Sequence, residues 1–396
     1  MQFSGTGMER REMQCLIASC RQESLDSGEV FFPSVYTCWV EAPHRLLSLA
    51  RRHGVVPLIY KQMQAHIGSY PSLEPSLSLF AKAYHRIAYR NMLMSAELLR
   101  IVALLGEAGI TARAFKGPAL ALLAYGDITM RQFGDLDLLV KVEDRQRAVA
   151  WMQQNGYLPE IVLKKSTEAL FFASVNVLGF RNPSNGIRIE LHWELFPKNY
   201  AVGWHAGRLW AAEGSLSLNH HPLPVLADKH RLLYLSIHGA KHLFERLEWV
   251  CDIDRVVRCM PKAAWDPLLE EAEQMGTMRM LCLGLECSRR FLGTPLPETV
   301  TQWIEKDPLL PVLVRKIVCH AYSKDLPQKR GYAAFLLLWQ MRERYSDRLR
   351  FAWRSIFSTK LDDFLWIQFS RKRAWLYLFV RPFRLWMKYS GHRDVK

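Results

Sequence analysis

The sequence predicts an α+β protein in which a small mixed sheet lies between an N-terminal and a C-terminal helical region. Apolar residues recur with helical spacing through residues 8–108. Short strand-like runs separated by turn residues follow up to residue 195, and helical spacing returns at residue 227. We therefore expect an N-terminal helical region, a mixed core, a C-terminal helical domain and a basic aromatic tail, over residues 1–108, 109–225, 226–345 and 346–396.

Length and composition limit the class of protein. At roughly 100–200 residues per domain, 396 residues predict two or three domains. A hydrophobic content of 49% with 23% charged residues excludes a disordered chain. The longest apolar runs, such as 374–380, are far shorter than the roughly 18 residues of a spanning helix, which excludes an integral membrane bundle.

Charge and cysteine usage indicate the partners and the compartment. The net charge of +15 favours a polyanionic partner, which includes phosphate-bearing substrates, nucleic acid and anionic lipid. Eight cysteines without a Cys-x-x-Cys pair predict buried thiols in a reducing compartment. Residues 9–12 are charged where a signal peptide needs an apolar core, so we expect a cytoplasmic protein.

The N-terminal region is expected to be entirely helical. Gly54 and Gly68 interrupt the apolar periodicity, which separates several amphipathic segments. The expected helices cover residues 9–21, 44–52, 57–66 and 77–107.

The mixed core is expected to begin with a strand, a tight turn and a helix. Residues 110–115 form a short β-like run that ends at Lys116-Gly117. Pro118 suits the first turn of a helix over 119–125. A second strand over 135–140 is indicated by alternating acidic and aliphatic residues.

The rest of the core continues in mixed fashion. Residues 143–155 have helical spacing and end at Gly156, a common helix stop. Apolar alternation predicts two further extended runs over 170–180 and 187–195. The Asn185-Gly186 pair between them is a strong hairpin signal.

Two aspartates and a glutamate are the candidate catalytic residues. Asp135 and Asp137 lie two residues apart on one expected strand, so both project from the same face. Two neighbouring carboxylates repel each other unless a cation neutralises them. Glu190, on another expected strand, would reach the same cation if that strand is the neighbour. All-oxygen ligation favours Mg²⁺ or Mn²⁺, and we expect these three acids to bind two ions.

A phosphate-binding turn is the expected complement of the acids. Backbone N–H groups at the start of the helix attract an anion, Gly117 lets a phosphate approach closely, and Lys116 adds a positive charge. Arg131 either binds a phosphate with two hydrogen bonds or forms a structural ion pair with one of the acids. His192 either contacts the substrate or orients a carboxylate and packs beside Trp193.

A pair of histidines near residue 240 has a different explanation. His238 and His242 are one helical turn apart, as in zinc proteases, but Gly239 occupies the position of the catalytic glutamate. We expect a polar seam against the mixed core instead. Asp252 and Asp254 are expected to pair with basic residues.

Taken together, the ordered motifs resemble those of the bacterial family called uncharacterised nucleotidyltransferases, within the polymerase-β-like superfamily. The likeness covers about residues 95–260. The motifs that carry it are Phe115-Lys116-Gly117, Tyr125-Gly126-Asp127, Arg131, Asp135-Leu136-Asp137, Gly156-Tyr157 and Glu190-Leu191-His192-Trp193, with His238, His242, Trp249 and Asp252. The superfamily has Gly-Ser where this chain and the narrower family have Lys116-Gly117.

The resemblance implies an enzyme that transfers a nucleoside monophosphate from a nucleoside triphosphate to a hydroxyl acceptor with two Mg²⁺ ions. Asp135, Asp137 and Glu190 would hold the metal. Lys116, Gly117 and Arg131 would hold the triphosphate. Members of the family accompany lasso-peptide and exopolysaccharide biosynthesis clusters, and the sequence leaves a peptide, a sugar and RNA open as the acceptor.

The tail leaves a second function open. From residue 341 to the end there are 14 basic and 5 acidic residues, and arginines interleave with aromatic residues over 350–386. Such a segment packs on the body, lies on anionic lipid at the inner face of the membrane, or stacks on RNA. The alternatives to a nucleotidyltransferase are thus a catalytically degenerate module in membrane-associated peptide or polysaccharide biosynthesis and an RNA-modifying transferase.

Overall fold

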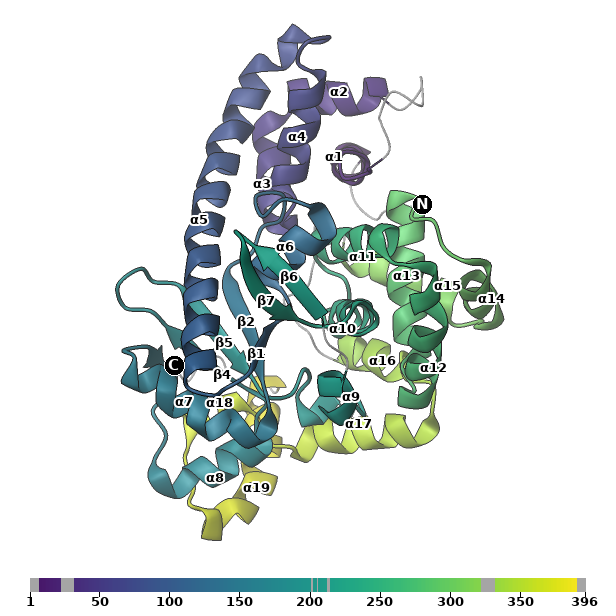
Figure 1. The fold of residues 1–396 in the computed structure, drawn as a ribbon. Coiled ribbons are helices and arrows are strands. Elements are labelled where there is room, and N and C mark those ends of the chain that lie inside the picture. The colour runs from purple at the N-terminus through teal and green to yellow at the C-terminus, as the bar shows by residue number, and fades with distance from the viewer. Residues whose placement is uncertain are drawn as a thin grey trace.

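The computed structural model describes residues 7–22, 32–200, 202–204, 206–211, 214–321 and 332–389. Within these ranges one seven-stranded sheet lies among helices, with the long helix α5 along one side and the C-terminal helices on the other (Figure 1). The predicted α+β class, a mixed sheet flanked by helical regions, is confirmed.

The sheet mixes parallel and antiparallel pairs. In space its strands follow the order β3-β4-β5-β2-β1-β7-β6. β2 is parallel to β5 and antiparallel to β1, and β7 is parallel to β1. The strands are β1 (Ala112–Ala114), β2 (Asp135–Val140), β3 (Leu158–Pro159), β4 (Val177–Arg181), β5 (Arg188–His192), β6 (Gly214–Leu218) and β7 (His221–Val225). The bounds of β2 are those expected from its alternating pattern, whereas β6 and β7 had no separate prediction.

The N-terminal region is helical, as expected, and its last helix covers the sheet. The elements are α1 (Gly7–Ala18), α2 (Phe32–Glu41), α3 (Pro43–His53), α4 (Val56–His66), the 3₁₀ turn η2 (Pro71–Leu73) and α5 (Glu74–Glu107). In α5 Met94, Leu98, Ile101 and Leu105 recur at spacings of four and three, so they form one buried apolar stripe. This stripe belongs to the same core cluster as the apolar side chains of β1 and β2.

The two faces of β2 have different neighbours. Leu136, Leu138 and Val140 are fully buried and share a core cluster with α5. Because side chains alternate along a strand, Asp135 and Asp137 point to the opposite face. The C-terminal helices pack on that opposite face of the sheet. The acids therefore lie between the sheet and a helical layer.

One predicted strand is partly helical. Residues 170–180 had the alternation of a single extended run, but the structure forms α8 (Lys165–Ser174) and then β4 (Val177–Arg181). Thr167 and Phe171 are both fully buried, and their separation of four residues is that of a helix face. The hairpin itself is confirmed: the Gly186 N–H donates to the Asn182 carbonyl at 2.8 Å, and β4 pairs with β5 in antiparallel register.

The remaining helices complete the covering layers. Those within the core are α6 (Gly117–Tyr125), η3 (Val142–Asp144), α7 (Arg145–Gln154), η4 (Lys198–Tyr200) and α9 (Ala206–Ala211). The C-terminal ones are α10 (Asp228–Lys241), α11 (Leu247–Cys259), η5 (Lys262–Ala264), α12 (Trp265–Met275), α13 (Met278–Leu292), α14 (Glu298–Lys306), α15 (Leu310–Ala321) and α16 (Tyr332–Gln340). Among all the helices that the structure describes, none has the length and apolar character needed to cross a bilayer.

The tail folds back onto the core. It consists of α17 (Tyr345–Phe357), α18 (Leu361–Trp366), η6 (Arg371–Leu376) and α19 (Tyr377–Tyr389), and residues 390–396 lie outside the described residues. Phe364 of α18 is buried with its ring centroid 5.2 Å from that of Phe171 in α8. Tyr377 packs against Phe364 at 5.1 Å. The tail is thus joined to the core through buried aromatic rings.

The cysteines agree only in part with expectation. Among the described residues, no cysteine forms a disulfide with another. However, Cys259 and Cys319 are exposed and Cys38 is half-buried, so the prediction of uniformly buried thiols is wrong. Cys259 is the last residue of α11 and Cys319 lies near the end of α15, where helix ends meet solvent.

Candidate active site

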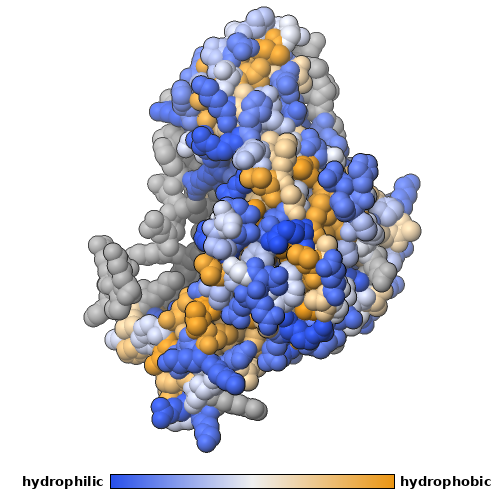
Figure 2. All heavy atoms as spheres, turned by 60° about the vertical axis from the view of Figure 1, so that its left-hand side comes forward, coloured by the Kyte–Doolittle hydropathy of each residue, from blue (hydrophilic) through white to orange (hydrophobic). Residues whose placement is uncertain are grey.

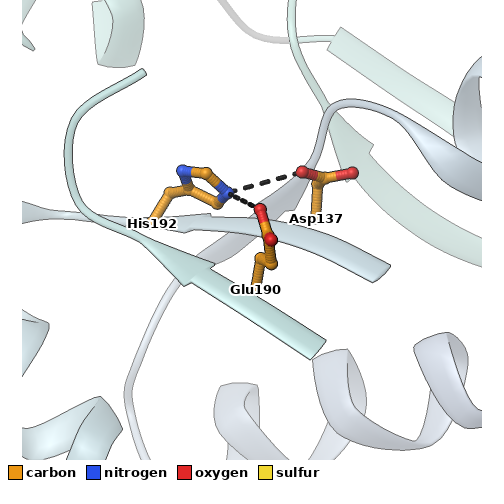
Figure 3. A group of neighbouring side chains, drawn as sticks. All are labelled: Asp137, Glu190 and His192. Atoms are coloured by element: carbon orange, nitrogen blue, oxygen red, sulfur yellow. Dashed lines mark hydrogen bonds and ion pairs between the residues drawn. The ribbon is translucent and has the colours of Figure 1, made fainter. Parts of the chain in front are cut away.

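The register between β2 and β5 brings two acids and a histidine together. Asp137 is the partner of Glu190 across the two parallel strands, and His192 follows Glu190 on the same face. The ligand atoms of these three side chains lie within 4.8 Å of one another (Figure 3). The His192 Nε2 lies 3.2 Å from the Glu190 Oε2 and 3.4 Å from the Asp137 Oδ1. The predicted convergence of Asp137 and Glu190 from neighbouring strands is present in the structure.

Asp135 lies at the edge of this group. It has the most accessible of the three carboxylates, with 35% of its side chain exposed. Burial, together with the charges of Asp137 and Glu190, raises the pKa of Asp135 to about 6. The three side chains that come closest together are Asp137, Glu190 and His192. The third member is therefore His192, whereas the sequence suggested Asp135. That all three acids bind metal stays a prediction.

Lys116 also contacts the Asp137 carboxylate and neutralises its charge. The antiparallel pairing of β1 with β2 brings the turn after β1 next to the first residues of β2. The Lys116 Nζ lies 3.3 Å from the Asp137 Oδ1 and 5.4 Å from the ring centroid of Tyr234. Although burial opposes both shifts, Lys116 and His192 hold the pKa of Asp137 below its usual range, and Asp137 raises that of Lys116.

His192 is enclosed by these charges and by aromatic rings. Burial lowers the basicity of an imidazole, but Asp137 and Glu190 outweigh burial and raise the pKa of His192. The Phe115 ring packs edge-on against His192 with centroids 5.1 Å apart. The Nδ1 of His192 is buried and has no hydrogen-bond partner among the described residues. Both carboxylates therefore stabilise the protonated form of His192, since both lie near its Nε2.

Gly117 is required by backbone geometry at the start of α6. Its φ of +53° lies in the left-handed region that side-chain-bearing residues avoid. A Cβ at this position would also lie 3.4 Å from the backbone oxygen of Asp135. The turn between β1 and α6 is thus held closely against the first residue of β2.

We expect Gly117→Ala to lower the free energy of unfolding by about 1 kcal/mol, because alanine would have to adopt the left-handed conformation. Urea unfolding of the purified protein measures this. Gly106→Ala in α5 is the matched control, since Gly106 has no positive φ and no atom within 4 Å of an added Cβ. If both variants unfold at the same urea concentration, the conformational explanation of Gly117 is wrong.

Arg131 forms a buried ion pair with α11. Its Nε and Nη2 each lie 2.8 Å from one oxygen of Asp252, and both residues are buried. The Tyr125 hydroxyl donates to the same carboxylate at 2.8 Å. Of the two roles considered for Arg131, the structure shows the ion pair, and contact with a triphosphate stays a prediction. Asp254 likewise pairs with Arg258, as expected of these two aspartates.

Sequence reasoning missed Arg188. This side chain lies 2.6 Å from Glu160, 3.0 Å from Glu190 and 3.6 Å from Asp135, measured between nitrogen and oxygen atoms. Arg188 therefore neutralises the more exposed acids Asp135 and Glu190, whereas Lys116 neutralises the buried Asp137. The signal was present, because Arg188 precedes Glu190 by two residues and must share its face.

An aromatic and histidine seam extends from Lys116 along α10. The Tyr234 hydroxyl and the His238 Nδ1 are 3.3 Å apart. The His238 ring lies 4.8 Å from that of His242 and 5.5 Å from that of Trp249. Burial and the charge of Lys116 lower the pKa of His238. These rings belong to α10, to the residue directly after it and to α11, and Tyr234 joins them to Lys116 of the mixed core. A seam of His238 and His242 against that core stays a prediction.

The cluster is suited to a divalent cation. Asp137 and Glu190 offer carboxylate oxygens and His192 offers an imidazole nitrogen, all from rigid strands. Carboxylates suit Mg²⁺ and Mn²⁺, and an imidazole in the set moves the preference away from Mg²⁺. Basic side chains now stabilise the negative charge that such an ion would neutralise.

A mixed sheet with acids on two neighbouring strands, and a Lys-Gly turn at a helix start beside them, defines a nucleotidyltransferase-type core. The family model described as uncharacterised nucleotidyltransferase matches residues 41–293 of the chain. Because this is more than half of its length, the chain belongs to that family, and the resemblance drawn from the motifs is confirmed.

Solved structures of low identity match parts of the chain. One is the lincosamide antibiotic adenylyltransferase LnuA with lincomycin bound, at 13% identity and a TM-score of 0.28, which covers 42% of this chain and 97% of that one. Another is an antigenic nucleotidyltransferase-like protein from Paracoccidioides brasiliensis, at 15% identity and a TM-score of 0.30, which covers 48% of this chain and 91% of that one. No curated protein matches the chain.

Proposed function

We propose that the chain transfers a nucleoside monophosphate from a nucleoside triphosphate to a hydroxyl acceptor, with divalent metal held by Asp137 and Glu190 and by Asp135 beside them. The observation that supports this most is the register that sets Asp137 opposite Glu190 on parallel strands. Membership of a nucleotidyltransferase family supports the reaction class.

Each residue of the cluster has a defined task in this proposal. The acceptor oxygen forms a bond to the α-phosphorus, and the bond from that phosphorus to the leaving pyrophosphate breaks. A bound divalent cation would stabilise the charge of the pyrophosphate and promote ionisation of the acceptor hydroxyl. Gly117 lets the triphosphate approach the N-terminus of α6. Lys116, the residue directly before α6, adds a positive charge beside it.

Lys116 and Arg188 have a second task. In the absence of substrate they keep three neighbouring carboxylates ionised and close together. The side chains of Lys116 and Arg188 would be available to the phosphate oxygens of a triphosphate if a divalent cation held by the acids neutralised these carboxylates instead. His192 orients Glu190 and Asp137 and, as a neutral imidazole, offers a further ligand. We infer that Mn²⁺ supports the reaction at least as well as Mg²⁺ because of this nitrogen.

The test uses the purified full-length chain, each of the four α-³²P-labelled nucleoside triphosphates, and Mg²⁺ or Mn²⁺. A cell extract supplies acceptors. We expect label from one or two nucleotides to enter a macromolecular fraction. Sensitivity of the labelled product to protease, glycosidase or ribonuclease then identifies the acceptor as peptide, sugar or RNA.

The absence of both nucleotide binding and label transfer with either metal would overturn the proposal. In that case Lys116 and Arg188 would have replaced the metal permanently as partners of the acids. The chain would then be a catalytically degenerate module, the alternative that the basic tail had suggested.

A further inference from the structure

The last helix of the chain is attached to the protein by its polar side. Arg381 is buried, and its Nη2 donates to the Ser355 carbonyl at 2.8 Å. The Arg384 Nε lies 2.8 Å from the Asp363 Oδ1, and the Arg381 Nη1 lies 3.5 Å from the other oxygen of that carboxylate. Tyr377 completes the contact by packing into the core. α19 is therefore held by buried ion pairs on one side.

Large aromatic side chains on the opposite side of α19, and at the end of the preceding η6, are exposed to solvent. Trp375, Phe379, Phe383 and Trp386 follow one another at spacings of four, four and three, so they form a single stripe. Their exposed fractions are 60%, 65%, 49% and 61%. Trp366 of α18 extends the stripe, since its ring stacks on Phe383 with centroids 6.3 Å apart. We call these five side chains the aromatic face.

This arrangement is the reverse of that in an ordinary amphipathic helix, which buries its apolar stripe. Contiguous apolar surface of this kind marks an interaction site. Figure 2 shows a group of apolar side chains low on the molecule, at the height where α8, α18 and α19 lie in Figure 1. With the described residues in place, the five side chains of the aromatic face keep exposed fractions of 47–65%.

The charges around the aromatic face are positive. Lys372 and Arg373 are exposed at its N-terminal end, directly before Trp375. The nearby acids are already paired, because Asp362 and Asp363 both contact Arg384. From residue 341 onward, basic residues outnumber acidic ones by 14 to 5. The surface thus joins exposed tryptophan and phenylalanine rings to unopposed positive charge.

We propose that the aromatic face binds the surface of an anionic lipid membrane, with α19 lying in the plane of the headgroups. Tryptophan and phenylalanine side chains on a helix flanked by basic residues are suited to this position. RNA is a poorer fit, because the arginines between the rings, Arg381 and Arg384, point inward to Asp363 and are not available to phosphates beside stacked bases. The proposal is independent of the catalytic cluster.

The test is flotation of the full-length protein with vesicles of phosphatidylcholine alone or with about one third phosphatidylglycerol. The variant Phe379→Ser/Phe383→Ser removes two exposed rings, and Lys372→Ser/Arg373→Ser removes two charges. Tyr89→Ser/Met92→Ser is the matched control, because these side chains of α5 are 66% and 54% exposed but lie outside the aromatic face. Circular dichroism checks that each variant is folded.

We expect the wild type and the control to float with anionic vesicles and to remain unbound with phosphatidylcholine. The ring variant should bind at least tenfold more weakly, and the charge variant should lose about tenfold or more because each basic residue contributes separately. Equal binding of the ring variant and the wild type would overturn the proposal. An absence of vesicle binding would also overturn the proposal. Sedimentation that shows a dimer broken by the ring variant, or a gel shift that shows bound RNA, would then identify the occupant of the aromatic face.

Discussion

Replacing Asp137 by asparagine is expected to reduce nucleotide transfer by at least a thousandfold. Asparagine keeps the shape of the side chain and removes the charge that Lys116 and His192 both face. Metal-ion catalysis supplies several kcal/mol of transition-state stabilisation, and about 4 kcal/mol corresponds to a thousandfold in rate. Label transfer in the assay above measures the rate, and calorimetric titration with Mn²⁺ measures whether the ion still binds.

The matched control for this variant is Asp144→Asn. Asp144 is the last residue of η3, a short distance beyond β2, and pairs with the exposed Arg147 at 2.7 Å. The Asp144→Asn variant therefore loses one negative charge in the same part of the chain without altering the cluster. Its rate of label transfer should equal that of the wild type. Transfer by Asp137→Asn at more than a tenth of the wild-type rate would contradict the proposed role.

Loss of activity could also follow from instability, because Asp137→Asn leaves Lys116 buried without its anion. The double variant Lys116→Met/Asp137→Asn removes that charge as well. We expect it to unfold at a urea concentration nearer to that of the wild type than the single variant does, and to remain inactive. An active double variant would show that Asp137 only balances the lysine.

Short-range features of this fold could be predicted from the sequence. The limits of β2 follow from two acids that alternate with leucines and from the aliphatic residues after them, and the β4–β5 hairpin follows from Asn185-Gly186. In each case the signal lies within a few residues, where backbone preferences and side-chain alternation act. The prediction that Glu190 lies beside Asp137 needed one additional assumption, that the two strands are neighbours.

What could not be predicted depends on contacts between distant parts of the chain. Arg131 meets Asp252 across 121 residues, and no local pattern selects that aspartate from other acids. Residues 170–174 are helical and not extended, because they continue a helix that begins before them and buries Thr167 and Phe171 on one face. Likewise the outward orientation of α19 follows from its ion pairs with Asp363, which the helical periodicity alone does not indicate.

Breaking the ion pair between Arg131 and Asp252 is expected to cost about 3–5 kcal/mol of unfolding free energy. Removal of one partner of a buried pair leaves the other charge without compensation in a low-dielectric interior. Both side chains are almost completely buried, with exposed fractions of 7% and 0%, so water cannot replace the missing partner. Arg131→Met and Asp252→Asn should each show this loss in urea unfolding.

The double variant Arg131→Met/Asp252→Leu should recover part of the lost stability, because it leaves no unpaired charge, although the Tyr125 hydroxyl then loses its acceptor. Arg147→Met is the matched control: it breaks the surface pair with Asp144, in which 57% of the arginine side chain is exposed, and should cost less than about 1 kcal/mol. Equal losses for the buried and surface variants would contradict the energetic role of the buried pair.

The same double variant separates the two roles of Arg131. If the arginine acts only by fixing α11 beside the turn before β2, the folded double variant should bind nucleoside triphosphate within about threefold of the wild type. If the guanidinium leaves Asp252 to contact a phosphate, the double variant should be folded and yet lose affinity at least tenfold, since a charge-assisted bidentate contact is worth about 1.5–3 kcal/mol. Because its two donors already have good geometry with a fully buried carboxylate, we expect the first result.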